Sequence, residues 1–327
     1  MYIKDRIYGE VKIDEDVIVA IINSEDFQRL KGVDQAGYFD VYFPGTKHSR
    51  FEHSVGCYIL LKKFGASLEE QIAGLIHDLS HTAFSHTADY VFREGSEAKH
   101  NYQDNIFEDF VKTTEISHIL EKYGYDIAYI LNEENFPLQE NDLPDICADR
   151  IDYSLRGMCI YMNIEQKEIK YFLDHLLAKE GQWFFDTYEV AMRYAELFKD
   201  LNDVYYANKE TAAMFYNTAQ WLLHAIEHQY IKHADVFTTD VTVINKINKH
   251  LSKDADLCMK WQKMNDPHII LGQNGEEGVV EVVVKSRVID PFFYEKGHIM
   301  RVSEKNDKWK DVVRKGLEPK MHYLKTV

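Results

Sequence analysis

Cysteine is scarce in this chain, and its few residues lack the spacing of a metal or disulfide motif. The 327 residues include four cysteines, at positions 57, 147, 159 and 258, with no CxxC pair. Thiolate metal clusters and disulfide-rich secreted folds are therefore not expected. The pattern predicts four buried, free thiols in a reducing compartment.

Long apolar runs and an excess of positive charge are also missing. No stretch of about 18 apolar residues occurs, so no membrane span is predicted. The N-terminal sequence MYIKDRIYGEVKID is charged and has no apolar signal-peptide region, and we expect a cytoplasmic protein. The formal net charge is −16, which argues against strong general nucleic-acid binding because phosphate backbones need clustered Lys and Arg. An anionic small substrate would need local positive charge.

Proline is rare as well, and helical periodicity dominates. Six prolines interrupt the chain, and apolar residues recur at i, i+3, i+4 and i+7. The texture changes near residue 233, where the Val-rich run GVVEVVVKSRVIDP follows a turn signal at 273–275. The sequence predicts a mainly α fold, with a helical body over 1–232 and a small α+β appendage over 233–327.

Local signals place three helix boundaries near the polar motifs. A helix over 51–64 is closed by Gly65, and a capping pattern at Ser67 opens the next helix. Pro144 is a favoured first helical residue, so we expect a further helix to begin there.

Two consecutive helices bring three polar residues together. His53 lies near the start of one helix, and His77 and Asp78 lie near the end of the next. Helices of similar length joined by a tight turn run antiparallel, so these side chains should be close. Imidazole and carboxylate form a mixed ligand set for Mn, Fe, Ni, Co or Zn. The polar stripe that carries Asp149 and Asp152 could supply a further ligand, or it could face solvent.

The segment HDLSHTAFSHTAD is dense in acid–base groups, with three His and two Asp in 13 residues. Asp89 follows His86 by three residues, so the two side chains can touch within a helix. We expect the carboxylate to raise the pKa of His86 and to favour its acid form. Such a group could protonate the leaving oxygen of a phosphate ester.

These motifs resemble those of the HD-domain phosphohydrolases, most nearly the deoxynucleoside triphosphate triphosphohydrolases, the bacterial dGTPases and the mammalian SAM-and-HD-domain protein. The resemblance covers most of the chain. It is carried by the ordered set RFEHS, HDLSH, AFSH and DRIDY, with a weaker match at KSRVIDPFFYEKGHIMRVSE. It implies an HD-domain helical bundle and hydrolysis of a phosphate ester or anhydride by metal-activated water.

The resemblance implies a role for each matching residue. One divalent ion per chain (Mn, Mg, Fe, Ni, Co or Zn) would be held by His53, His77, Asp78 and Asp149. Residues around the scissile phosphate would be His81, His86, Asp89 and His100, with His86 as the general acid. Substrate contacts would come from Arg50, Gln35, Arg150, Tyr153 and Tyr216.

Departures from the family pattern concern the substrate. Asn208 and Ala219 stand where the family carries cations along the triphosphate, and Gly157 replaces an Asp that reads the sugar. Lys209 could substitute after a one-residue shift. We therefore predict that triphosphates are preferred over less charged esters by no more than about tenfold, or roughly 1.4 kcal/mol.

Two other functions fit the same residues. A di-iron oxygenase would need a second metal, which His81, His86 or His100 could hold. A catalytically weak nucleotide sensor would bind without turnover. The expected partner of the chain is a nucleotide or another phosphorylated small molecule, and the resembling branch implies a homo-oligomer, a dimer or tetramer.

One further pair has metal spacing. His224 and His228 are i, i+4 on an expected helix, but no HExxH glutamate accompanies them. They are interpreted as surface histidines, and Asp240 as a solvated acid.

Overall fold

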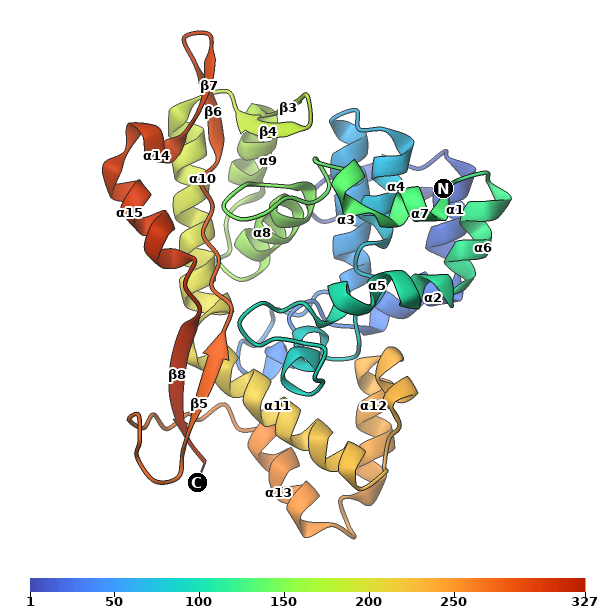
Figure 1. The fold of residues 1–327 in the computed structure, drawn as a ribbon, viewed down its shortest axis with the longest axis vertical. Coiled ribbons are helices and arrows are strands. Elements are labelled where there is room, and N and C mark those ends of the chain that lie inside the picture. Colours follow the sequence, from blue (N-terminus) through green and yellow to red (C-terminus); the bar gives the residue numbers. More distant parts are fainter. Residues whose placement is uncertain (327) are drawn as a thin grey trace.

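The computed structural model describes residues 1–326, and helices form most of it (Figure 1). The α-helices are α1 (Asp16–Asn23), α2 (Glu25–Gln28), α3 (Arg50–Lys63), α4 (Leu68–Ile76), α5 (Tyr102–Lys112), α6 (Glu115–Lys122), α7 (Ile127–Leu131), α8 (Ala148–Ile160), α9 (Gln166–His175), α10 (Tyr188–Leu201), α11 (Lys209–Glu227), α12 (Asp240–Ile247), α13 (Ala255–Met264), α14 (Val302–Lys305) and α15 (Asp307–Gly316). The mainly α prediction is confirmed.

Within residues 1–326, eight short strands form three small sheets. The strands are β1 (Tyr2–Asp5), β2 (Gly9–Lys12), β3 (Leu176–Lys179), β4 (Gln182–Phe185), β5 (Val279–Val284), β6 (Phe292–Glu295), β7 (His298–Arg301) and β8 (Lys320–Lys325). β1 pairs with β2, β5 pairs with β8, and the third sheet has the order β3-β4-β6-β7. The last sheet joins strands from before and after residue 233 through the parallel pair β4–β6.

The segments after residue 233 lie against different parts of the helical body (Figure 1). Trp309 of α15 is buried in the same apolar core as Trp183 of β4, whereas Leu257 of α13 packs in a cluster with Trp221 of α11. The predicted boundary between 232 and 233 stays a prediction, and the C-terminal residues complete cores of the preceding helices.

Helices α3 and α4 form the expected antiparallel hairpin. Ser49 and Glu52 make a reciprocal capping box at the start of α3, and Gly65 follows the helix with a left-handed φ of +76°. At α4 only half of the predicted box forms. The Ser67 hydroxyl accepts from the Glu70 N–H, but the Glu70 carboxylate accepts from backbone N–H groups at 138 and 139.

The prediction that a helix begins at Pro144 is wrong, because α8 begins at Ala148. The Pro144 carbonyl accepts a hydrogen bond from the Asp290 N–H at 2.8 Å, and Cys147 before the helix is extended, with φ −139° and ψ 172°. A long-range contact therefore replaces the first helical turn. Asp149 becomes the second residue of α8.

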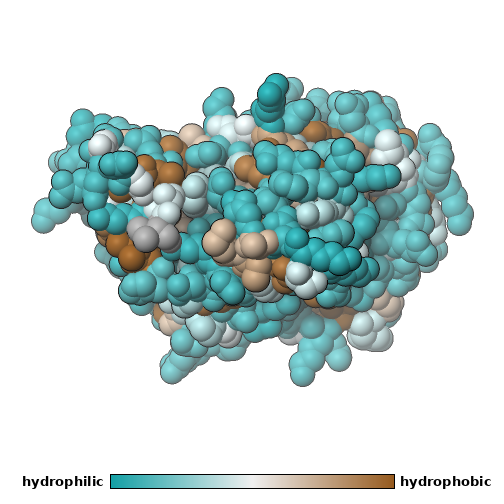
Figure 2. All heavy atoms as spheres, turned by 90° about the horizontal axis from the view of Figure 1, so that it is seen from below, coloured by the Kyte–Doolittle hydropathy of each residue, from teal (hydrophilic) through white to brown (hydrophobic). Residues whose placement is uncertain are grey.

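Within residues 1–326, no helix combines the length and apolar character that crossing a membrane requires. Figure 2 views the molecule from below, where hydrophilic side chains cover most of the surface and apolar ones form small, separate patches. The dimer or tetramer and the cytoplasmic location stay predictions.

Candidate active site

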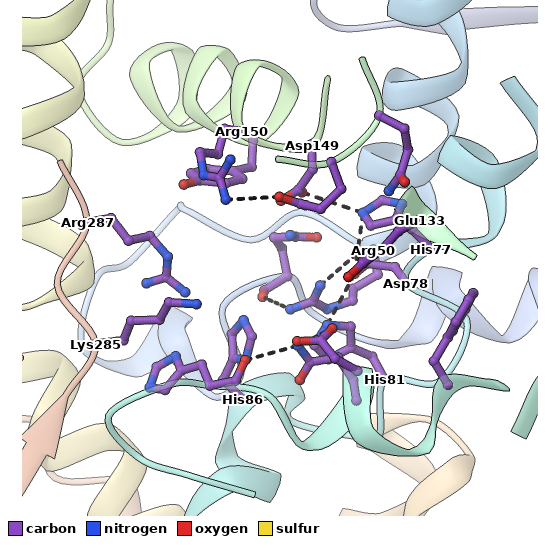
Figure 3. Close-up of a pocket in the computed structure, with 18 of the residues that line it drawn as sticks. Arg50, His77, Asp78, His81, His86, Glu133, Asp149, Arg150, Lys285 and Arg287 are labelled. Carbon is purple, nitrogen blue, oxygen red and sulfur yellow. Dashed lines mark hydrogen bonds and ion pairs between the residues drawn. The ribbon is translucent and has the colours of Figure 1, made fainter. Parts of the chain in front are cut away.

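A cavity of about 790 Å³ opens between the α3–α4 hairpin, α5, α8 and the segment after β5 (Figure 3). Its lining includes nine residues singled out from the sequence: Gln35, Arg50, His77, Asp78, His81, His86, His100, Arg150 and Tyr153. Asp149 also lines it, beside the buried His53. Residues spread over more than 230 positions thus meet at one hollow.

The four residues expected to hold a metal lie together at one side of this cavity. The Nε2 atoms of His53 and His77 are 3.2 Å apart. Asp149 Oδ1 lies 2.8 Å from the first of these atoms and 3.5 Å from the second. Asp78 places its two oxygens 3.7 Å from His53 Nε2 and 3.5 Å from His77 Nε2. Two imidazoles and two carboxylates therefore converge on one point.

The outer nitrogen of each imidazole already has an acceptor. His53 Nδ1 lies 2.8 Å from Asp152 Oδ2, and His77 Nδ1 lies 2.8 Å from the Gly74 carbonyl. With the proton on Nδ1, both Nε2 lone pairs face the convergence point, which is the arrangement of metal-binding histidines. The residues therefore fit a divalent cation.

The electrostatics of this cluster favour positive charge. Burial alone would raise the pKa of Asp149, but its hydrogen bonds to His53 and His77 hold that pKa well below its usual range. Burial opposes the charged form of His77, yet Asp78 and Asp149 outweigh it and raise the pKa of His77 to about 10. Two close carboxylates thus attract a proton or a metal ion to the same place.

Asp152, on the polar stripe considered above for a further ligand, lies behind His53 and contacts its outer nitrogen. Its carboxylate accepts from Tyr8 at 2.9 Å, pairs with Arg156 at 2.7 Å and faces His53. Asp152 and Arg156 are fully buried, so this polar stripe of α8 does not face solvent. Gly56 permits the approach, because a Cβ there would lie 2.1 Å from both side chains. The i, i+4 spacing of the Asp–Arg pair was the available signal.

Cys57 also lies beside this cluster, with its Sγ within 4.8 Å of ligand atoms of His53, His77 and Asp149. The Sγ is 3.7 Å from His53 Nδ1 and 3.8 Å from His53 Nε2, and burial raises the pKa of the thiol well above its usual value. A neutral thiol is a poor metal ligand. All four cysteines are free in the described chain, as predicted, but Cys159 and Cys258 are only half-buried.

The wall next to the metal cluster carries the other histidines. His81 Nε2 lies 3.2 Å from Asp78 Oδ1, and the rings of His86 and His100 stack with centroids 4.7 Å apart. His86 Nδ1 lies 3.3 Å from Asp89 Oδ2, so the expected contact is present.

The prediction that Asp89 raises the pKa of His86 is wrong. Burial lowers the pKa of His86 well below its usual value, and His81 and Arg50 lower it further. Asp89 does not offset this, and its second oxygen accepts from the Tyr102 N–H at 2.9 Å. His86 is therefore neutral at neutral pH.

The turn before His86 is held in an uncommon conformation. Phe84 and Ser85 have φ of 61° and 49°, a region that costs non-glycine residues about 1–3 kcal/mol each. Asp240 accepts from the Phe84 N–H at 2.8 Å, and Ser85 donates to the Asp34 carbonyl at 2.5 Å. Asp240 is 7% exposed, so the prediction of a solvated acid is wrong. It fixes the loop that presents His86.

Arg50 and Arg150 line the cavity but are already paired. Arg50 binds Asp78 at 2.6 Å and donates to Ser85 Oγ at 2.8 Å. Arg150 binds Glu140 at 2.9 Å and donates to a backbone carbonyl. Each of these arginines pairs with a carboxylate of the protein, so most of its charge is compensated within the protein.

Two unpaired cations line the opposite side, Lys285 and Arg287, and the sequence reading missed them. They follow β5 and alternate with the buried Ser286, so both point the same way. Figure 3 shows them reaching into the cavity opposite His77 and Asp78. Within residues 1–326, neither side chain forms a hydrogen bond or ion pair. Burial and the neighbouring Arg287 lower the pKa of Lys285 to about 8. The signal in the sequence was the run KSRVIDP, in which Lys285 and Arg287 alternate with Ser286.

Two other candidates lie elsewhere. Tyr216 lines a separate hollow of about 290 Å³ beside α13 and, within the described residues, not the main cavity. Lys209 lies 3.6 Å from Glu210 and is likewise absent from the lining that residues 1–326 provide. Tyr216 as a sugar contact and Lys209 as a substitute phosphate contact therefore receive no support here.

Three buried polar atoms of the cavity wall have no partner within residues 1–326. They are Gln35 Oε1, Tyr153 Oη and His100 Nδ1. Buried polar groups are nearly always hydrogen-bonded, so these three atoms are available to water or to a bound molecule.

A helical bundle whose His and Asp side chains converge from α3, α4 and α8 defines the HD class of protein. The family model of the HD domain matches residues 50–157. The uncharacterized protein YdhJ of Bacillus subtilis is 39% identical over 296 residues, which are 90% of this chain and 89% of that protein. The chain belongs to the HD-domain phosphohydrolase superfamily.

Other relatives match over shorter spans. A protein named metal-dependent phosphohydrolase cns2, from Cordyceps militaris, is 36% identical over 54% of this chain and 50% of its own length. The deoxynucleoside triphosphate triphosphohydrolase SAMHD1 of Gallus gallus is 34% identical over 42% of this chain and 26% of its own length. A solved phosphohydrolase from Bacteroides thetaiotaomicron shares the fold along the whole chain, with a TM-score of 0.72 at 17% identity.

Proposed function

We propose that this chain is a metal-dependent phosphohydrolase that cleaves a phosphate ester or anhydride bond of a nucleotide. The proposal rests on the pair of imidazoles His53 and His77. Their Nε2 atoms lie 3.2 Å apart, beside two carboxylates, and each Nδ1 atom has a hydrogen-bond acceptor of its own. The family and the relative named metal-dependent phosphohydrolase agree with this chemistry.

The proposed ligands are His53, His77, Asp78 and Asp149. A divalent ion in this position would lower the pKa of a water molecule and polarise the phosphoryl oxygen. The mixed N/O set suits Mn, Fe, Co, Ni or Zn. Arg50, bound to Asp78, keeps that carboxylate ionised and oriented, since its charge contributes strongly to holding the pKa of Asp78 well below the usual range.

His86 is the proposed general acid. Burial, and then His81 and Arg50, lower its pKa. A phosphate anion beside the ring would raise that pKa, because an opposite charge stabilises the imidazolium. The protonated ring could then donate to the leaving oxygen. Substrate binding would thus create the acid, with His100 stacked behind it.

Lys285 and Arg287 favour a substrate with charge beyond the scissile phosphate. The metal cluster and Arg50 suffice for one phosphate, which would leave these two partly buried cations without an ion-pair partner, at a cost in free energy. A second or third phosphate extending toward them would supply it. Lys285 and Arg287 would take the place of the cations that the family carries where this chain has Asn208 and Ala219. Their charge favours nucleoside di- or triphosphates as substrates. The named relative SAMHD1 is consistent with this direction.

The orphan groups Gln35 Oε1 and Tyr153 Oη would bind hydroxyl or base atoms of the nucleoside. Tyr206, which also lines the cavity, offers an aromatic face for the base.

The test is direct. Purified protein loaded with Mn is incubated with nucleoside mono-, di- and triphosphates and simple phosphate esters, and the products are separated by chromatography. We expect release of phosphate, pyrophosphate or tripolyphosphate by the wild type and its loss in His77→Ala. The matched control is His118→Ala, whose side chain is 84% exposed. Failure of every substrate, or an active His77→Ala protein, would contradict the proposal.

A di-iron oxygenase remains the second candidate because of one observation. Single ligand atoms of His86, Asp89 and His100 lie within 4.8 Å of one another. A second ion there would join the first across the cavity and would occupy the proposed acid. Two irons per chain that are lost in His86→Ala, with an iron absorption band, would favour this function. A nucleotide sensor would instead bind the nucleotide panel without turnover.

A further inference from the structure

A second cluster of metal-ligating side chains lies at the C-terminal end of α11. His224 and His228 are one helical turn apart, and their rings stack with centroids 4.0 Å apart. His224 Nε2 lies 2.7 Å from Oδ2 of Asp254, the N-cap of α13. One ligand atom from each of the three residues lies within 4.8 Å of the others.

The remaining polar atoms of these side chains are occupied by other groups. His228 Nδ1 donates to the His224 carbonyl at 2.9 Å, and His224 Nδ1 lies 3.2 Å from Asp256 Oδ2. Tyr230 donates to Asp254 Oδ2 at 2.9 Å. Each imidazole thus has its Nδ1–H directed to an acceptor, which leaves Nε2 as the ligand atom. The same tautomers occur at His53 and His77, and they are typical of metal-binding histidines.

Burial makes this a formed site with one open side. His224 is buried and its side chain is 6% exposed, the Asp254 side chain is 13% exposed, and His228 faces solvent. Asp254 is also held by the Leu257 N–H, which donates to Oδ1 at 2.9 Å. Two of the three side chains therefore have fixed positions before any ion arrives, and the third closes the site from outside.

We propose that His224, His228 and Asp254 bind a divalent transition-metal ion of the zinc type. Two imidazoles and a carboxylate are a common zinc ligand set, and water would complete the tetrahedron on the exposed side. The ion would replace the proton between His224 and Asp254 and would join α11 to the start of α13. The site is independent of the proposed phosphohydrolase function, because its three ligands lie outside the lining that residues 1–326 give the cavity.

The experiment compares bound Zn(II) in the wild type and His228→Ala. Each protein is dialysed against Zn(II), and bound zinc per chain is measured by elemental analysis. We expect His228→Ala to bind one equivalent of zinc fewer than the wild type. We also expect added Zn(II) to raise the Tm of His228→Ala by less than it raises the Tm of the wild type. His250→Ala is the matched control, because its ring stacks on Tyr230 at 3.9 Å but offers no ligand to the cluster.

The proposal is tested by the difference of one zinc equivalent between the wild type and His228→Ala, whatever the total. If the main cavity also binds zinc, the wild type should hold two ions and His228→Ala one. If the cavity binds none, they should hold one and zero, so a failure of the proposed function can be told apart from a failure of this site. Asp254→Asn supplies a second variant that can still accept the Leu257 hydrogen bond and should also lose one equivalent. Equal zinc content in the wild type, His228→Ala and Asp254→Asn would overturn the proposal.

Discussion

The two sides of the main cavity differ in how their charged groups are paired. On the side of α3, α4 and α8, the charges compensate one another, as Arg50 with Asp78 and His53 with Asp149 show. On the other side, Lys285 and Arg287 make no ion pair within residues 1–326. Under the proposed function, the first side would bind a cation that stays with the protein, and the second would bind an anion that arrives and leaves with the substrate.

The largest effect should come from removing a ligand on the metal side. Asp149→Ala should lose bound metal and lower activity by more than about a hundredfold, because even residues that only support a metal ligand are worth roughly 10–100-fold in affinity or activity. Asp142→Ala, an exposed acid at the cavity rim, is the control. Full metal content in Asp149→Ala would move the fourth ligand elsewhere.

Removing a cation on the opposite side should change substrate preference. Lys285→Ala and Arg287→Ala should each lower kcat/KM for nucleoside triphosphates by about 10–100-fold, since a hydrogen bond to a charged group is worth about 1.5–3 kcal/mol. Monophosphates should be much less affected, and metal content should stay unchanged. Steady-state kinetics on both substrates, with Lys209→Ala as the control, gives the answer. Equal losses for mono- and triphosphates would remove the distinction between the two sides.

A smaller effect is expected from the residue that orients His53. Asp152→Asn should weaken metal binding by about 10–100-fold, because it weakens the acceptor for His53 Nδ1–H. Excess Mn should restore activity if the role is positioning. Activity that stays low at saturating metal would instead indicate damage to the fold through the buried partner Arg156.

The smallest effect is a dependence on pH from Lys285. Its pKa is lowered to about 8 by burial and by Arg287, while Asp104 opposes the shift and Arg150 adds to it. The amine therefore loses its charge as pH rises through 8, and KM for a triphosphate should increase above that pH. Lys285→Arg should flatten the rise, because arginine stays charged. An unchanged KM profile in Lys285→Arg would assign the titration to another group.

The metal side could be predicted from the sequence, and the opposite side could not. His53 and His77 lie on a local helix hairpin, so helix length and one tight turn were enough to bring them together. Lys285 and Arg287 reach the cavity through the pairing of β5 with β8 about 40 residues later, a long-range contact that local patterns do not encode. The predicted start of α8 was wrong for the same reason, because the Pro144 carbonyl accepts a hydrogen bond from the distant Asp290 N–H.

Burial was the other property that the sequence did not reveal. Asp89 lies beside His86 as expected, but the low pKa of His86 follows from the surrounding protein, which no spacing rule describes. His224 was interpreted as a surface residue, whereas Asp254 and Asp256 cover it from the next helix in space.

The most direct test of the central claim is hydrolysis in water enriched in oxygen-18. The Mn-loaded wild type is given the best nucleotide of the panel, and the masses of the products are measured by mass spectrometry. If activated water attacks phosphorus, the product that contains the attacked phosphorus gains one oxygen-18 atom, and the leaving group stays unlabelled. A label on the carbon side of the broken bond, or no turnover with any nucleotide at full metal content, would contradict it.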